Sequence, residues 1–237
     1  RDPFHVPMPW DTSQLSKKNS RKVALCFETP GFKTNPEIIK GLRIAADALS
    51  NVGFDVKEVT PPLLEETAKT GYSALLGEVQ SLLGEDIRKS GSEKIQMIFD
   101  EYFRQFEPYD GKKLLTAMAE RTRYAREWAL FMDEYPLIIS NLIPTTFFYP
   151  DRDAEGAAGV TEVLGAALWS YSVNFIGHPA GIVPTHISYT ETGATPIGIQ
   201  IIGQRWREDA VVSALITIEN HCGTIYEKLW KQLGWLN

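Results

Sequence analysis

The first clear hydrophobic pattern along the chain is an apolar run, Lys22–Phe27, that ends at a threonine–proline–glycine turn. Such a run, bounded by turn residues, is typical of a fully buried strand. Thr34-Asn-Pro-Glu37 has the pattern of a helix capping box with proline in the first turn, and Phe54–Val59 alternates like a second strand. Residues 21–60 are therefore predicted to form a strand–helix–strand unit with parallel strands and a right-handed crossover.

Beyond this unit the apolar residues recur at helical spacing in three stretches, roughly Leu63–Lys89, Ser92–Phe106 and Lys112–Glu134. The other faces of these stretches carry mixed charges. Amphipathic helices of this kind usually cover a sheet. Residues 63–135 are therefore predicted to be a helical cover.

Residues 136–237 return to strands and end in a helix. The elements predicted there are a buried strand at Pro136–Ile143, a short helix over Glu162–Tyr171, strands at Ala180–Val183 and Ile197–Ile202, and a helix at Glu208–His221. The turn residues of Ser188–Gly193 favour antiparallel pairing of the last two strands. Residues 1–20, rich in proline and then polar, are predicted to be an extended lead-in. The predicted fold class is α/β, a mixed β-sheet covered by helices.

Composition and charge exclude several classes of partner. Of the 237 residues 43% are hydrophobic, which is enough for a sizeable core. The net charge is -6 and the positive charges are interspersed with acids, so no basic surface for nucleic acid is expected. No apolar run approaches the ~20 residues that span a bilayer. Charges such as Glu85 and Lys89 also argue against a membrane-inserted hairpin.

The residues that bind metals or act as nucleophiles are few. Two cysteines, Cys26 and Cys222, do not make a disulfide framework, so a reducing, cytoplasmic location is expected. The histidines are scattered, at His5, His178, His186 and His221, and give no metal-site spacing. No metal or cofactor is predicted. Cys26 and His178 could meet as nucleophile and base, but a thiol inside an apolar run is usually inert packing.

Self-contained catalytic motifs are absent from the sequence. It contains no Gly-x-Ser-x-Gly, no phosphate-binding glycine loop, no Gly-Gly pair and no Ser-Ser pair. Two stretches nevertheless have unusual patterns, Asn174–Pro184 and Thr195–Gln204. On physical grounds they are architectural: Gly177 and Pro179 give a sharp entry into a strand, and His178 is expected to be a hydrogen-bonded turn histidine.

Taken together, these two stretches resemble the C-terminal landmarks of the amidase signature family. That family has an Asn-x-x-Gly-x-Pro corner, then a Pro-x-Gly-x-Gln-x-x-Gly strand before its last helix. Asp2-Pro3 resembles the Asp-Pro that follows the family's signature region, and Tyr135–Thr146 resembles its Tyr-Asp-Leu-Leu-Leu-Thr-Pro-Thr strand. The resemblance covers nearly the whole chain. It implies that residues 1–237 are the C-terminal portion of one amidase-signature-like domain.

The resemblance also implies a function. The family hydrolyses amides with a Ser–cis-Ser–Lys triad and a glycine-rich oxyanion hole. These groups belong to the region upstream of Arg1, so no catalytic residue is carried over, and the start at Arg1 without methionine has the character of a cut end. The expected partners are the N-terminal catalytic half, a small amide substrate and possible further copies of the chain. The alternative is a catalytically inactive amidase-like binding module.

The expected role of this half is to complete the sheet and form part of the substrate pocket. Its candidate substrate-binding residues lie at strand ends and corners: Thr145, Thr146, Phe147, Phe175, Ile176 and Gly177. Glutaminase members of the family carry an acid just upstream of the corner, facing the substrate's ammonium group. The corresponding position here is near Ala167, in an apolar stretch. An uncharged or apolar amide is therefore expected in place of glutamine.

Overall fold

The computed structural model describes residue 6 and residues 21–190 and 193–236; the lead-in predicted at 1–20 otherwise lies outside the described residues. Within them, five strands form one mixed sheet in the order β2-β1-β3-β5-β4. The strands are β1 (Lys22–Leu25), β2 (Asp55–Glu58), β3 (Leu137–Ser140), β4 (Ala180–Thr190) and β5 (Gly193–Gly203). The prediction of an α/β fold with a mixed sheet is confirmed.

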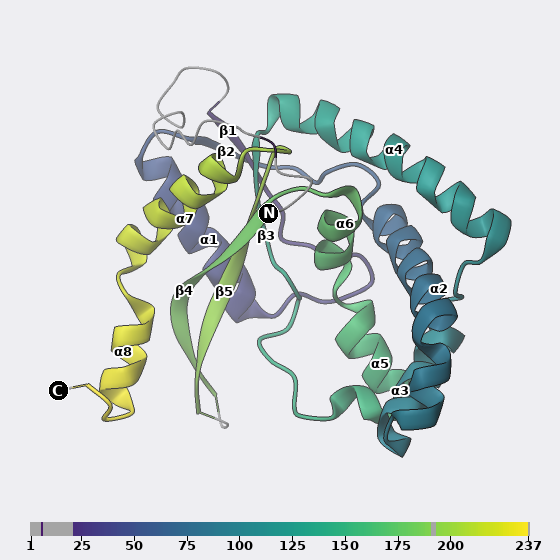
Figure 1. Cartoon of the computed structure of the whole chain (residues 1–237). Helices are drawn as coiled ribbons and strands as arrows, with labels where there is room; N and C mark the ends of the chain where they lie inside the picture. The colour runs from purple at the N-terminus through teal and green to yellow at the C-terminus, as the bar shows by residue number, and fades with distance from the viewer. Residues whose placement is uncertain (1–5, 7–20, 191–192, 237) are drawn as a thin grey trace.

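The helices lie on both faces of the sheet, with α1, α7 and α8 on one side and α2 to α6 on the other (Figure 1). Their bounds are α1 (Pro36–Asn51), α2 (Leu64–Ser90), α3 (Glu93–Gln105), α4 (Gly111–Glu134), α5 (Gly156–Val160), α6 (Leu168–Ile176), α7 (Glu208–Cys222) and α8 (Ile225–Gln232). Helix α8 was not predicted from the sequence. The prediction of a single helix over Glu162–Tyr171 is wrong, because a π turn at Thr161–Gly165 separates α5 from α6.

The predicted strand–helix–strand unit is present, with β1 parallel to both β2 and β3. Its helix cap differs from the prediction. The N-cap of α1 is Asn35, whose side chain accepts the Glu37 backbone N–H at 2.8 Å. Thr34 instead donates its hydroxyl to the Phe27 carbonyl at 2.7 Å. Since Pro36 takes the first helical position and needs no N–H partner, the cap falls on the residue before it.

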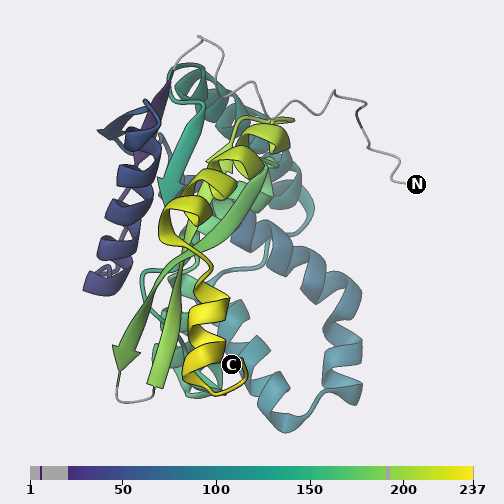
Figure 2. The same cartoon turned by 90° about the vertical axis from the view of Figure 1, so that its left-hand side faces the viewer.

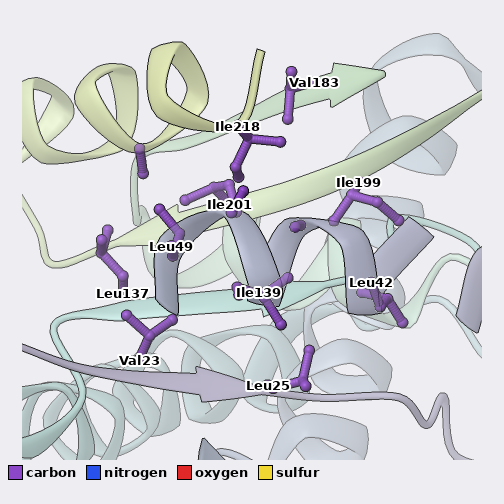
Figure 3. Close-up of a cluster of buried hydrophobic side chains, with 14 of the residues drawn as sticks. Val23, Leu25, Leu42, Leu49, Leu137, Ile139, Val183, Ile199, Ile201 and Ile218 are labelled. Carbon is purple, nitrogen blue, oxygen red and sulfur yellow. The ribbon is translucent and has the colours of Figure 1, made fainter. Parts of the chain in front are cut away.

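Two hydrophobic clusters hold the sheet between its helices. One lies under α1 and α7 and includes Leu42, Ile139, Ile201 and Ile218, all fully buried (Figure 3). The other lies under α4 and α6. Its members include Ala24, Trp128, Ile138, Trp169, Ile176 and Ile202. Successive residues of β3 point into opposite clusters, so this strand is apolar on both faces, as predicted.

The buried face of α2 differs from the apolar face that the sequence indicates. Leu75, Leu82 and Leu83 recur at helical spacing along this stretch, yet they are 44%, 70% and 50% exposed. The contacts with α6 are made by Tyr72, whose ring lies against Tyr171, and by small residues. A Cβ added to Gly71 would lie 2.8 Å from the Phe175 ring, so only glycine permits this approach. At this point the close packing of the two helices depends on the missing side chain of glycine.

The β4–β5 hairpin is longer than predicted. β4 runs to Thr190 and β5 starts at Gly193, so the predicted turn residues Ser188–Gly193 are largely strand, and positions 191–192 lie outside the described residues. The antiparallel pairing itself is confirmed, with a register shift between Pro184 and His186. The distal half of the hairpin projects beyond the other strands, with α8 beside it (Figure 2).

The buried position of Ile139 gives a direct test of this packing. Ile139→Ala should lower the free energy of unfolding of the complete protein by about 2–5 kcal/mol, because it removes buried methylenes and leaves a cavity between β3 and α1. Equilibrium denaturant unfolding measures this loss. The matched control is Ile216→Ala on the outer face of α7, where the side chain is 48% exposed. Equal losses in the two variants would contradict the assigned core.

Candidate functional site

The corner between α6 and β4 is built around Gly177. This residue has φ +74°, a left-handed conformation that ends α6, and its N–H donates to the Val173 carbonyl at 2.9 Å. Asn174, the first residue of the corner landmark, lies inside the last turn of α6, with its amide nitrogen 3.4 Å from the Ser170 hydroxyl oxygen. The sharp turn expected at Gly177 is therefore present, and it follows Asn174 by about one turn of helix.

Three of the predicted substrate-binding residues follow the carboxyl end of β3. Thr145, Thr146 and Phe147 are half-buried in the loop beyond Ser140. The Thr145 hydroxyl donates to the Phe147 carbonyl at 3.4 Å, and the Phe147 ring meets the Tyr149 ring edge-on at 5.2 Å between centroids. These contacts are local, so they define the shape of the loop.

The other three predicted residues lie at the far end of the strands. Phe175 is half-buried, Ile176 is fully buried in the α6 cluster, and Gly177 is exposed. β4 begins opposite the end of β5 that pairs with the start of β3. The corner is therefore at the opposite end of β3 from the loop that carries Thr145. The six candidates fall into two groups, and their role in substrate binding stays a prediction.

An apolar groove runs between α2, α4 and α6, with a volume of about 520 Å³. Its lining includes Phe175 from the predicted set, with Leu75, Leu82 and Met118 from the neighbouring helices. Glu78 is the one charged side chain in the described lining. The groove can therefore accept an aliphatic or aromatic group, and the exposed Leu75 and Leu82 of α2 form one of its walls.

His178 is a structural part of the corner. Its Nδ1 lies 3.0 Å from the Gly203 carbonyl, which can only accept, so Nδ1 carries the proton. Burial lowers the pKa of the imidazole below its ordinary value, and the nearby charge of Arg205 acts in the same direction. The neutral ring packs 5.9 Å from Trp128, centroid to centroid. These contacts tie the corner to the end of β5 and agree with a turn role.

A threonine–histidine–glutamate series connects β4 to α1. His186 Nε2 lies 3.0 Å from a Glu37 carboxylate oxygen, and His186 Nδ1 lies 3.2 Å from the Thr185 hydroxyl. The order of groups resembles a hydrolase triad. Thr185 is only 3% exposed, however, and packs against Gly41 on α1. No substrate can reach the hydroxyl, so this series anchors the irregular part of β4.

Cys26 is packed in the core. It is 2% exposed, and its thiol donates to the Val59 carbonyl at 2.8 Å. Burial raises its pKa far above the ordinary value for a thiol. The structure gives it no contact with His178, so the idea of a cysteine–histidine pair has no support. Among the described residues no three His, Cys, Asp or Glu side chains gather as metal ligands. None of the helices there has the length and apolar composition needed to cross a bilayer.

The fold is a helix-covered mixed α/β domain, and the corner after α6 carries the landmarks described in the sequence. The Amidase family profile matches residues 2–212, and the chain therefore belongs to the amidase family, as predicted from the resemblance to amidase signature enzymes.

The individual relatives agree with this family. An indoleacetamide hydrolase of Bradyrhizobium diazoefficiens is 29% identical over 98% of this chain, which covers 44% of that protein. The 6-aminohexanoate cyclic dimer hydrolase structure has a TM-score of 0.68 at 20% identity, with 95% of this chain and 51% of that one covered. A fatty acid amide hydrolase structure has a TM-score of 0.71 at 17% identity, with coverage of 93% and 43%. The chain thus spans about half the length of the curated relatives it matches.

Several site residues escaped the sequence analysis. Arg121 on α4 and Arg205 after β5 donate to the carbonyls of Phe175 and Ile176 at the end of α6. No local pattern marks these arginines, because their partners are 54 and 29 residues away. Glu37 was noted only for helix capping, although its carboxylate also binds His186.

The burial of Cys26 predicts its reactivity. In the folded protein at pH 8, iodoacetamide should alkylate Cys26 at least about tenfold more slowly than Cys222, because the half-buried Cys222 lies nearer to solvent. Peptide mass spectrometry over time measures both rates. In denaturant the two thiols should react at similar rates. Equal rates in the native protein would show that Cys26 is accessible.

Proposed function

We propose that this chain is the substrate-side half of an amide hydrolase, whose nucleophilic serine lies upstream of the chain. The family match over residues 2–212 supports this proposal most strongly. The chain contains no Ser-Ser or Gly-Gly pair for the family's triad and oxyanion hole. Since it spans about half of its relatives, the remaining half of such an enzyme has room for both. The upstream half is then the principal partner.

The proposed substrate is an uncharged amide with an apolar or aromatic group. Helix α6 supports this choice, because it has no charged side chain between Leu168 and Ile176. Ala167, where glutaminases have an acid, is flanked by buried Ala166 and Leu168. A substrate ammonium group would find no partner here and would pay for its desolvation. The name of the indoleacetamide hydrolase relative fits an aromatic amide.

The six candidate residues are proposed to contribute to substrate binding from two places, the loop after β3 and the corner after α6, with the fully buried Ile176 supporting the corner from inside the core. Phe175 is the best placed of them for an apolar group, because it lines the 520 Å³ groove. Gly177 keeps the corner free of a side chain. The proton transfers are assigned to the upstream half, since His178 is held in its turn by the Gly203 carbonyl.

A serine-directed probe tests where the chemistry resides. In the complete protein that contains this chain, a fluorophosphonate should label one serine, and peptide mapping should place that serine upstream of residue 1. The 237-residue chain by itself should stay unlabelled, since a reactive serine needs an adjacent base and an oxyanion hole. Heat-denatured complete protein is the control for nonspecific reaction.

The mapped position decides between the alternatives. Stoichiometric labelling of a serine within residues 1–237 would contradict an upstream nucleophile. A complete protein with no reactive serine and no hydrolysis of indole-3-acetamide would favour the inactive binding module.

A charge placed at the head of α6 tests the substrate class. Ala167→Glu should lower kcat/KM of the complete protein for indole-3-acetamide at least about tenfold, equivalent to ~1.4 kcal/mol, because the carboxylate has no partner in this apolar stretch. Steady-state kinetics measure the loss, and the melting temperature is followed in parallel.

The matched control is Ala158→Glu, which makes the same change at an exposed position of α5. It should leave kcat/KM close to that of the unmodified protein. An Ala167→Glu variant that hydrolyses indole-3-acetamide normally would place the substrate away from α6. A wild-type preference for L-glutamine would overturn the proposed substrate class.

A further inference from the structure

Two guanidinium groups converge on the exposed glycine at the end of α6. Arg121 donates Nε to the Phe175 carbonyl at 2.5 Å, and Arg205 donates Nη2 to the Ile176 carbonyl. The Nη2 atoms of Arg205 and Arg121 lie 3.6 and 3.8 Å from the position that a Cβ on Gly177 would occupy. Because residue 177 has no side chain, the space that both arginines face is open.

Capping of the helix accounts for only part of this arrangement. A helix C-terminus carries the equivalent of about half a negative charge, whereas the two arginines bring two full positive charges. Each guanidinium has five N–H donors, and in the structure each guanidinium donates to a single carbonyl. In the described part of the chain neither arginine forms a salt bridge. Most of their donors therefore remain available to a ligand.

A cavity of about 510 Å³ adjoins this corner, between α4 and the segment after β5. Arg205 lies on its wall together with Arg126, and neither has a carboxylate partner among the described residues. Arg207 is neutralised by Asp209, at 2.8 and 3.2 Å. Asp133 is the remaining acid in the lining, so the unpaired arginines leave the cavity positive.

His178 also lines this cavity and adds an acceptor to it. Its Nδ1 is used by the Gly203 carbonyl, so the neutral ring keeps a lone pair on Nε2. The cavity thus combines planar cationic donors with one neutral acceptor. That combination matches an oxyanion whose ligand also carries a hydrogen-bond donor, since guanidinium groups bind carboxylates and phosphates through paired N–H bonds.

We propose that Arg121, Arg205 and the open space at Gly177 form a binding site for the oxyanion of a small ligand, a carboxylate or a phosphate group. The adjoining cavity holds the rest of that ligand. Neither the proposed amide substrate nor the family match assigns such a site. It does not depend on hydrolysis, so binding can be measured whether or not the protein cleaves amides.

The test is a calorimetric titration of the complete protein with sodium acetate and, separately, sodium phosphate, at an ionic strength held constant with sodium chloride. Saturable binding of at least one of the two is expected, and the better one identifies the oxyanion. Arg121→Gln and Arg205→Gln should each weaken it at least about tenfold, because each removes a charge-assisted pair of donors. Arg88→Gln, the same change at an exposed position of α2, should bind like the unmodified protein.

An NMR titration covers the case in which loss of a helix cap prevents folding. In the unmodified protein, the chemical shifts of two arginine Nε–H signals should change on addition of acetate or phosphate. One of these signals should be absent from the spectrum of the folded Arg121→Lys variant, and the other from that of the folded Arg205→Lys variant. The proposal is overturned if no saturable binding occurs, if Arg88→Gln weakens it as much as Arg205→Gln does, or if neither arginine signal moves.

Discussion

The burial of β3 on both faces is the constraint on which the rest of the structure depends. All four residues from Leu137 to Ser140 are buried, with Leu137 and Ile139 under α1 and α7 and Ile138 under α4 and α6. A strand in this position must be covered from both sides, because each exposed face would return apolar side chains to water. The positions of α1, α7, α4 and α6 follow from this need.

The corner after α6 is a consequence of the same constraint. Helix α6 covers one face of the sheet, and the chain must then reverse within three residues to enter β4 at the sheet edge. Gly177 permits the reversal through its left-handed backbone. His178 then ties the corner to the end of β5. The arginines that cap α6 stand here because the reversal leaves helix carbonyls open to solvent.

The sequence correctly predicted the elements in which apolar residues form an unbroken run or recur at a single regular spacing. The runs Lys22–Phe27 and Pro136–Ile143 were assigned as buried strands, and the structure contains β1 and β3 there. The helix over Glu162–Tyr171 was placed wrongly, because a π turn breaks the period and shifts the apolar face of the next helix, α6. The buried face of α2 was not indicated by its apolar residues, since Gly71 makes one of its closest contacts with α6. A pattern of hydrophobic residues does not reveal a helix contact that is made by a glycine.

The candidate site was less predictable for a related reason. Local patterns locate residues at strand ends, but they do not tell which ends meet. Thr145 and Gly177 were grouped because both follow or precede strands, and the antiparallel register places them at opposite ends of β3. Arg121 and Arg205 come together only through tertiary packing. A pairwise contact of this kind has no signature within a single stretch of sequence.

The landmarks that identified the family are themselves products of packing. In the strand landmark, a Cβ on Gly203 would lie 2.6 Å from the Val211 side chain, so helix α7 can pack closely only on glycine. Gln200 is 3% exposed and pairs in register with the buried Ser140 of β3. Neither residue faces an open cavity among those described. Such positions are characteristic of a fold because few side chains fit the space and the hydrogen-bonding groups around them. The chemistry of an enzyme that uses this fold must then come from surfaces that the packing leaves open, of which the Gly177 corner is one.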